Sequence, residues 1–86
     1  MAVRKLNNNF NVIGENLRRI RKANHLSQAA LMNELNLLGI NVHKNDIWLI
    51  EANKRTVKDY ELWGFVNVLN IDYADLFKDI ENKLEY

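Results

Sequence analysis

Apolar residues recur along this chain at the three- and four-residue spacing of an α-helix, and no alternation typical of a β-strand persists. The chain contains no proline and no cysteine, so capping residues must end its helices and packing alone must hold its core. Its 86 residues can build one modest core. The sequence therefore predicts a single all-α domain, with the cysteine-free composition typical of a reducing cytoplasm.

Five helices follow from the apolar spacing and from the residues that flank it. They are expected over residues 12–23, from 28 to the residue before Gly39, from 43 or 44 to about 53, over 59–69, and from 72 to near the chain end. Asn11 and Ser27 can cap the first two helices. Asn24 and Asn53 tolerate the left-handed conformation at the ends of the first and third. The expected organisation is a loosely ordered arm over 1–11, a helical domain over 12–78 and a C-terminal helix end over 79–86.

Charge is distributed unevenly along the chain. Residues 1–58 contain ten Lys and Arg against four Asp and Glu, whereas residues 59–86 contain two against seven. A basic front is typical of a chain that binds a polyanion, and an acidic end favours solubility or a protein contact. Ordinary solvated faces with a chance asymmetry are the alternative interpretation.

Three runs of sequence resemble the phage-repressor-like, or Cro/repressor XRE-type, family of helix-turn-helix DNA-binding domains. They are IGENLRRIRKANHLSQAAL at 13–31, GINVHKNDIWLIEANKR at 39–55 and YELWGFVNVLNIDYADLF at 60–77. The resemblance implies a five-helix lambda-repressor-like fold and a transcriptional regulator, in particular a repressor, whose third helix reads the major groove of double-stranded DNA. The connection between the second and third helices, Leu35–Ile40, is several residues longer than the commonest form.

The resemblance places functional residues on the third helix and around it. Base readout is expected from Lys44, Asn45, Trp48 and Leu49. Contacts with the DNA backbone are expected from Gln28, Arg18, Lys22, Lys54, Arg55 and Lys58. Arg21 and Glu51 are expected to form a buried structural ion pair. For each of these residues the alternative is an ordinary solvated side chain.

The third helix also carries side chains that are unusual for a DNA-reading surface. Asp46 places a negative charge where phosphate would pass, and Leu49 replaces a common Arg or Lys. Trp48 is expected first to pack on the apolar insertion around Leu37 and Ile40; contacts with sugar and thymine methyl groups, or a protein interface, are its alternatives. A second hypothesis is therefore a protein-interaction or dimerisation module built on this fold, with DNA binding weak or lost.

One reading helix covers only a few base pairs, so a homodimer on two half-sites is expected. Ile80 and Leu84 are expected to form the dimer contact, with Trp63 beside them, because they extend past what the remaining helices can cover. A frayed C-terminal turn is the alternative.

Other classes of function find no support in the sequence. His25 and His43 fall in different turns without metal-ligand spacing, and no Gly-rich phosphate loop, Cys nucleophile or Ser elbow occurs. Apolar stretches are too short to cross a bilayer. We therefore expect no enzyme, metal, cofactor, small-molecule ligand or membrane partner, and a bacterial or phage-encoded protein associated with the nucleoid in the cytoplasm.

Overall fold

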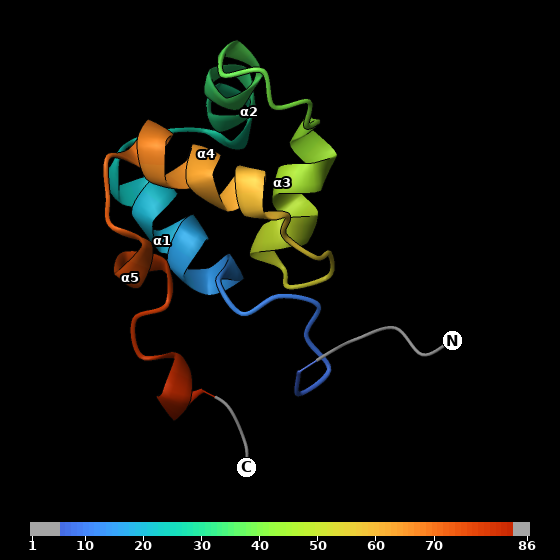
Figure 1. Cartoon of the computed structure of the whole chain (residues 1–86), viewed down its shortest axis with the longest axis vertical. Coiled ribbons are helices and arrows are strands. Elements are labelled where there is room, and N and C mark those ends of the chain that lie inside the picture. Colours follow the sequence, from blue (N-terminus) through green and yellow to red (C-terminus); the bar gives the residue numbers. More distant parts are fainter. Residues whose placement is uncertain (1–5, 84–86) are drawn as a thin grey trace.

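The computed structural model of this chain describes residues 6–83 and folds them into a bundle of short helices (Figure 1). Within these residues the helices are α1 (Gly14–Ala23), α2 (Gln28–Leu37), α3 (Lys44–Glu51), α4 (Asp59–Leu69) and α5 (Tyr73–Leu76), followed by a short 3-10 helix, η1 (Ile80–Asn82). An isolated bridge pairs Leu6 with Asn9. The expected all-α fold with five α-helices is confirmed.

Local capping explains why the first two helices begin where they do. The side-chain oxygen of Asn11 accepts hydrogen bonds from the backbone N–H groups of Ile13 and Gly14, at 3.0 and 3.1 Å. The hydroxyl oxygen of Ser27 accepts one from the N–H of Ala30 at 3.0 Å. These N–H groups have no partner inside a helix, so the side chains complete the first turns.

Left-handed residues follow several of the helices. Gly39 follows α2 at a φ of 85°, and Asn53 follows α3 at a φ of 60°, as the sequence predicts. After α1 the prediction is wrong by one residue, because Asn24 has a φ of −89° and His25 takes the left-handed conformation at 58°. The side-chain amide of Asn24 instead donates to the carbonyl oxygen of Ile20 at 2.9 Å, beside the bond from its own backbone N–H at 3.0 Å.

The core lies where α1, α2, α3 and α4 meet, and α5 closes one side of it (Figure 1). Its fully buried side chains include Leu17, Leu31, Leu35, Ile47, Ile50, Phe65 and Leu76. The long connection between α2 and α3 contributes to this core, because Ile40 and Val42 are 5% and 1% exposed. Ile40 lies against α4 at Gly64, where an added Cβ atom would collide with its side chain. The apolar insertion therefore packs on α4.

The C-terminal segment departs from the expected long fifth helix. α5 ends at Leu76, and Asp79, at a φ of 60°, separates it from η1. The buried side-chain amide of Asn16 in α1 donates to the carbonyl oxygens of Leu76 and Lys78, both at 2.9 Å. A continuing helix would use those oxygens for its own N–H groups, so this contact accounts for the early end of α5.

This early end changes the expected dimer contact. Ile80 turns inward and is only 9% exposed, so it offers little surface to a partner. Leu84, the other residue expected there, lies outside the described residues. Trp63, expected beside them, is 44% exposed on α4.

The segment before α1 is held against the end of α3. The N–H of Phe10 donates to the carbonyl oxygen of Asn53 at 3.0 Å, and the side-chain amide of Asn11 donates to that of Ile50 at 3.0 Å. The expected loose arm therefore has fixed contacts at its last two residues, and residues 1–5 lie outside the described part of the chain.

Gly14 opens α1 where this helix touches the end of α3. A Cβ atom on Gly14 would collide with the backbone carbonyl oxygens of Ile50 and Glu51 and with the side chain of Asn53. In an open helix, a change from Gly to Ala stabilises by about 1 kcal/mol. Here we expect Gly14→Ala to lower the melting temperature by several degrees instead, because backbone atoms must move aside. Thermal unfolding followed by circular dichroism measures the effect.

Gly64→Ala is the matched control. Its Cβ atom would meet the ends of the Ile40 and Leu35 side chains, which can adjust more easily than backbone. We expect it to destabilise less than Gly14→Ala. A Gly14→Ala variant as stable as the wild type would show that α1 and α3 do not approach this closely.

Candidate functional site

A buried ion pair joins α1 to α3. Arg21 Nε donates to Glu51 Oε2 at 2.6 Å, and Arg21 Nη2 donates to Oε1 at 3.1 Å. The two residues are 7% and 8% exposed. Arg21 Nη1 donates to the carbonyl oxygen of Leu26 at 2.7 Å, which fixes the turn between α1 and α2 as well. Removing one partner of such a pair costs about 3–5 kcal/mol, so the pair strongly constrains how these helices meet.

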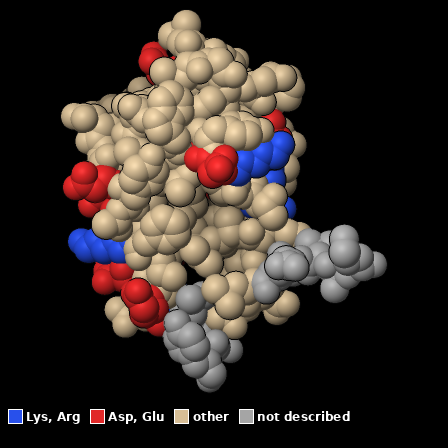
Figure 2. Space-filling view, in the orientation of Figure 1, with Lys and Arg blue, Asp and Glu red and all other residues tan. Residues whose placement is uncertain are grey.

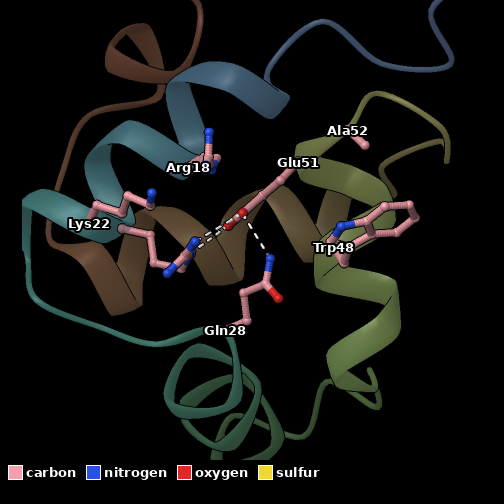
Figure 3. A pocket seen from close by; sticks show the side chains of 7 residues that line it. Arg18, Lys22, Gln28, Trp48, Glu51 and Ala52 are labelled. Atoms are coloured by element: carbon pink, nitrogen blue, oxygen red, sulfur yellow. Dashed lines mark hydrogen bonds and ion pairs between the residues drawn. The ribbon is translucent and has the colours of Figure 1, made fainter.

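Gln28 connects the first turn of α2 to the same carboxylate. Its Nε2 donates to Glu51 Oε1 at 3.1 Å (Figure 3). Because Arg21 binds this carboxylate too, α1, α2 and α3 meet at one side chain. Gln28, expected at the DNA backbone, is therefore held in place by a bond inside the protein.

The ion pair lies at the base of a hollow of about 310 Å³ between α1, α2 and α3 (Figure 3). Arg18 and Lys22 of α1 line one side, and Trp48 and Ala52 of α3 line the other. The charge of Arg21 is neutralised within its pair, whereas Arg18 and Lys22 make no ion pair among residues 6–83. The hollow therefore presents positive charge at its opening.

The exposed face of α3 adjoins this hollow. Lys44, Asn45 and Trp48 surround a wide opening of about 570 Å³ together with Gln28. Trp48 is 47% exposed, and Nζ of Lys54 lies 5.4 Å from the centre of its ring. The structure thus brings three of the four expected base-reading residues together with two of the expected backbone-contacting residues.

Two expected contact residues lie apart from this face. Leu49 is only partly exposed and lines neither hollow. Lys58 is the N-cap residue of α4, and its Nζ lies 5.7 Å from the ring centre of Tyr60. Neither residue therefore belongs to the surface formed by Gln28 and Lys44.

Trp48 does not pack as first expected. Leu37 is 80% exposed, so no large side chain covers it. Ile40 is buried against Gly64 of α4. The insertion is stabilised by α4, and the indole of Trp48 is left on the open face of α3.

Arg55 belongs to an ion-pair network rather than to an open basic surface. Its Nη1 and Nη2 donate to the two carboxylate oxygens of Glu61, each at 2.9 Å, and its Nε lies 3.5 Å from Oδ1 of Asp46. Asp46 also accepts a hydrogen bond at 2.9 Å from the backbone N–H of His43, which caps α3. Arg55 thus links the first turns of α3 and α4. Its charge is compensated inside the fold, and its expected contact with the DNA backbone stays a prediction.

Glu61 is the positioning residue that the sequence reasoning missed. It is 2% exposed and also accepts the backbone N–H of Lys58 at 2.9 Å. Burial raises the pKa of Glu61, but the hydrogen bonds from Arg55 and Lys58 and the attraction of both charges outweigh it, so the pKa is lowered overall. The bond to Glu61 raises the pKa of Arg55 against the opposing effect of burial. The one local signal in the sequence that indicates this role of Glu61 is its position three residues after the N-cap of α4, as in a capping box.

The lowered pKa of Glu61 predicts a specific dependence of stability on pH. The stabilisation is present above the unfolded-state pKa of about 4.3 and is lost as pH falls through the lower folded-state pKa. We expect Glu61→Gln to reduce the free energy of unfolding by about 2 kcal/mol at neutral pH. The difference should shrink as the pH falls below about 4.3 and through the folded-state pKa, because the wild-type carboxylate then becomes protonated. Urea unfolding at several pH values measures the difference.

Asp59→Asn is the control for this effect. Asp59 is exposed in the same first turn of α4, and its removal should change stability by about 0.5 kcal/mol or less. A Glu61→Gln deficit that stays constant from neutral to acidic pH would contradict an ionised Glu61 as its origin.

Three further findings concern residues 6–83. Every buried side-chain nitrogen or oxygen in this part has a hydrogen-bond partner. No group of three or more His, Cys, Asp or Glu side chains there is arranged to hold a metal ion. None of the described helices has the length and apolar character needed to span a bilayer.

Neither a protein-family model nor a curated protein sequence matches this chain. Among solved structures, the restriction-modification controller protein C.AhdI from Aeromonas hydrophila superposes with a TM-score of 0.67 at 25% identity, covering 79% of this chain and 96% of that chain. An HTH_3 family transcriptional regulator from Vibrio cholerae gives a TM-score of 0.69 at 22% identity, covering 85% of this chain and 39% of that chain. These likenesses confirm the expected all-α helix-turn-helix fold.

Proposed function

We propose that this chain, which has the fold of the phage-repressor-like XRE-type helix-turn-helix domains, binds double-stranded DNA and regulates transcription. One observation carries the proposal. Lys44, Asn45 and Trp48 lie exposed on one face of α3, beside the first turn of α2, while Ile47 and Ile50 on the other face are fully buried. The second helix of this motif enters the major groove with its N-terminal residues against base edges.

The chemistry of the α3 face suits the major groove. Lys44 can donate to the O6 and N7 acceptors of guanine, and Asn45 can bind adenine through one acceptor and one donor. Gln28 stands at the N-terminus of α2, where free backbone N–H groups favour a phosphate. Arg18 and Lys22 lie across the hollow and can neutralise phosphates beside it.

We infer repression as the mode of regulation, because a protein seated in the groove blocks other proteins from the same stretch of DNA. Such a role places the protein on the nucleoid, in the cytoplasm of a bacterium. The competing hypothesis is a protein-interaction module that uses Trp48 and its neighbours on α3. Dependence on salt separates the two, since phosphate contacts release counterions and apolar protein contacts do not.

Fluorescence anisotropy with a labelled duplex selected from a random pool tests the function. About four phosphates neutralised by each copy predict a slope near −3.6 per copy for log affinity against log salt. Lys22→Ala should weaken binding to selected and random duplexes alike and make the slope shallower by about 0.9 per copy. Lys78→Ala, an exposed change after α5, should leave both affinity and slope unchanged. Absence of duplex binding at low salt would favour the protein-interaction hypothesis.

We propose that two copies bind together, because one reading helix covers too few base pairs for useful specificity. The face that carries α4 shows few charged side chains (Figure 2). The large side chains that α4 and the α5 segment leave exposed are Tyr60, Trp63, Tyr73 and Phe77. Aromatic residues are enriched in protein interfaces, so exposed aromatic side chains of α4 and the α5 segment, Trp63 among them, replace Ile80 as the proposed dimer contact.

Sedimentation equilibrium tests the homodimer. We expect a dimer at micromolar concentration that becomes a monomer on Trp63→Ser with helical content retained, because the change removes an exposed aromatic anchor. A wild-type chain that stays monomeric, both free and on a single-site duplex, would rule the dimer out.

A further inference from the structure

Trp48 is a large apolar side chain that the core does not use. It is 47% exposed, while its neighbours Ile47 and Ile50 are fully buried. Ile40 packs against Gly64 of α4 and does not cover Trp48. The indole of Trp48 is therefore exposed on α3, and a binding partner could bury it.

A lysine on the turn after α3 contacts the indole ring. Lys54 lies 5.4 Å from the ring centre, and its backbone N–H donates to the carbonyl oxygen of Leu49 at 2.9 Å. The left-handed Asn53, at a φ of 60°, turns the chain so that Lys54 comes back to α3. A cation near the ring stabilises its position. Figure 3 shows Trp48 and Ala52 on α3, across the hollow from Arg18 and Lys22.

The ring lies one helical turn after the two polar reading residues. Lys44, Asn45 and Trp48 border the same opening, so the indole would face a base pair next to those read by the polar side chains. Gln28 borders the opening as well and is fixed by its bond to Glu51. The indole and the polar reading side chains therefore line one opening, beside a glutamine fixed from within the fold.

Indole chemistry limits what the ring can recognise in the major groove. It offers one N–H donor and no acceptor, so it can bind at most one purine acceptor and cannot pair with the amino groups of adenine or cytosine. Covering the edges of those bases with an apolar ring would leave their polar groups without partners. The C5-methyl group of thymine is the apolar group that the major groove presents.

We propose that Trp48 is a specificity-determining residue that recognises thymine through its C5-methyl group. This inference rests on the proposed DNA binding by α3. It assigns one thymine in each half-site, adjacent to the base pairs contacted by Lys44 and Asn45, and Lys54 positions the ring for this contact.

Replacement of thymine by deoxyuridine tests the inference without altering the protein. Each thymine of a selected duplex is replaced in turn, and affinity is measured by anisotropy at fixed salt. One position in each half-site should lose affinity about fourfold, the effect of one buried methyl group. The Trp48→Ala variant, with helical content checked by circular dichroism, should bind the thymine and deoxyuridine duplexes equally at that position.

Leu37→Ala is the matched control, because it removes another exposed apolar side chain away from the opening. It should keep the full deoxyuridine effect. At the same position, a change from thymine to cytosine should weaken binding, and 5-methylcytosine should recover part of the loss for the wild type but not for Trp48→Ala.

The outcomes separate this inference from the proposed function. Strong duplex binding with no deoxyuridine-sensitive position, or with a sensitivity that survives in Trp48→Ala, overturns the role of Trp48 and leaves DNA binding intact. Affinity could instead fall when a purine is replaced by 7-deazapurine and stay unchanged when thymine is replaced by deoxyuridine. That result would mean that the indole N–H donates to a purine N7, which also overturns the proposed recognition of thymine. Absence of any duplex binding overturns both proposals.

Discussion

The carboxylate of Glu51 joins α1, α2 and α3 and so sets the position of the exposed face of α3. It accepts hydrogen bonds from Arg21 of α1 and Gln28 of α2, and it belongs to α3 itself. A buried carboxylate must keep its partners, because an unpaired charge in the interior is costly. The three helices can therefore shift relative to one another only by breaking charged hydrogen bonds. The positions of Lys44 and Trp48 on the outer side of α3 follow from that constraint.

A second ion-pair network fixes the opposite end of α3. Arg55 joins Glu61, at the start of α4, to Asp46, which caps the start of α3. The charge of Asp46, which the sequence suggests would repel phosphate, is thus partly compensated inside the protein. The same contacts compensate the charge of Arg55, so it adds little net positive charge to the surface. The basic charge counted in the sequence overstates what the surface can offer, because Arg21 and Arg55 are both neutralised internally.

The helices could be predicted, and their starts to within two residues, because their causes are local. Apolar spacing and the capping oxygens of Asn11 and Ser27 act within a few residues. The early end of α5 could not be predicted, since it depends on Asn16, a side chain 60 positions before the carbonyl of Leu76 that it binds. In the site, spacing on one helix brought Lys44 and Asn45 together. The role of Arg55 depended on the distance between two helices, which sequence alone does not provide.

Lysine footprinting tests the central claim most directly, that the α3 face meets DNA. Lysines of the free and duplex-bound protein are acetylated briefly and compared by mass spectrometry. The account predicts that DNA protects Lys22 and Lys44, which line the two hollows, and Lys54, which lies over the ring of Trp48. Lys78, beyond α5, should stay reactive. Protection of Lys78 with Lys44 equally reactive in both states would contradict it, because the DNA would then lie on another face of the molecule.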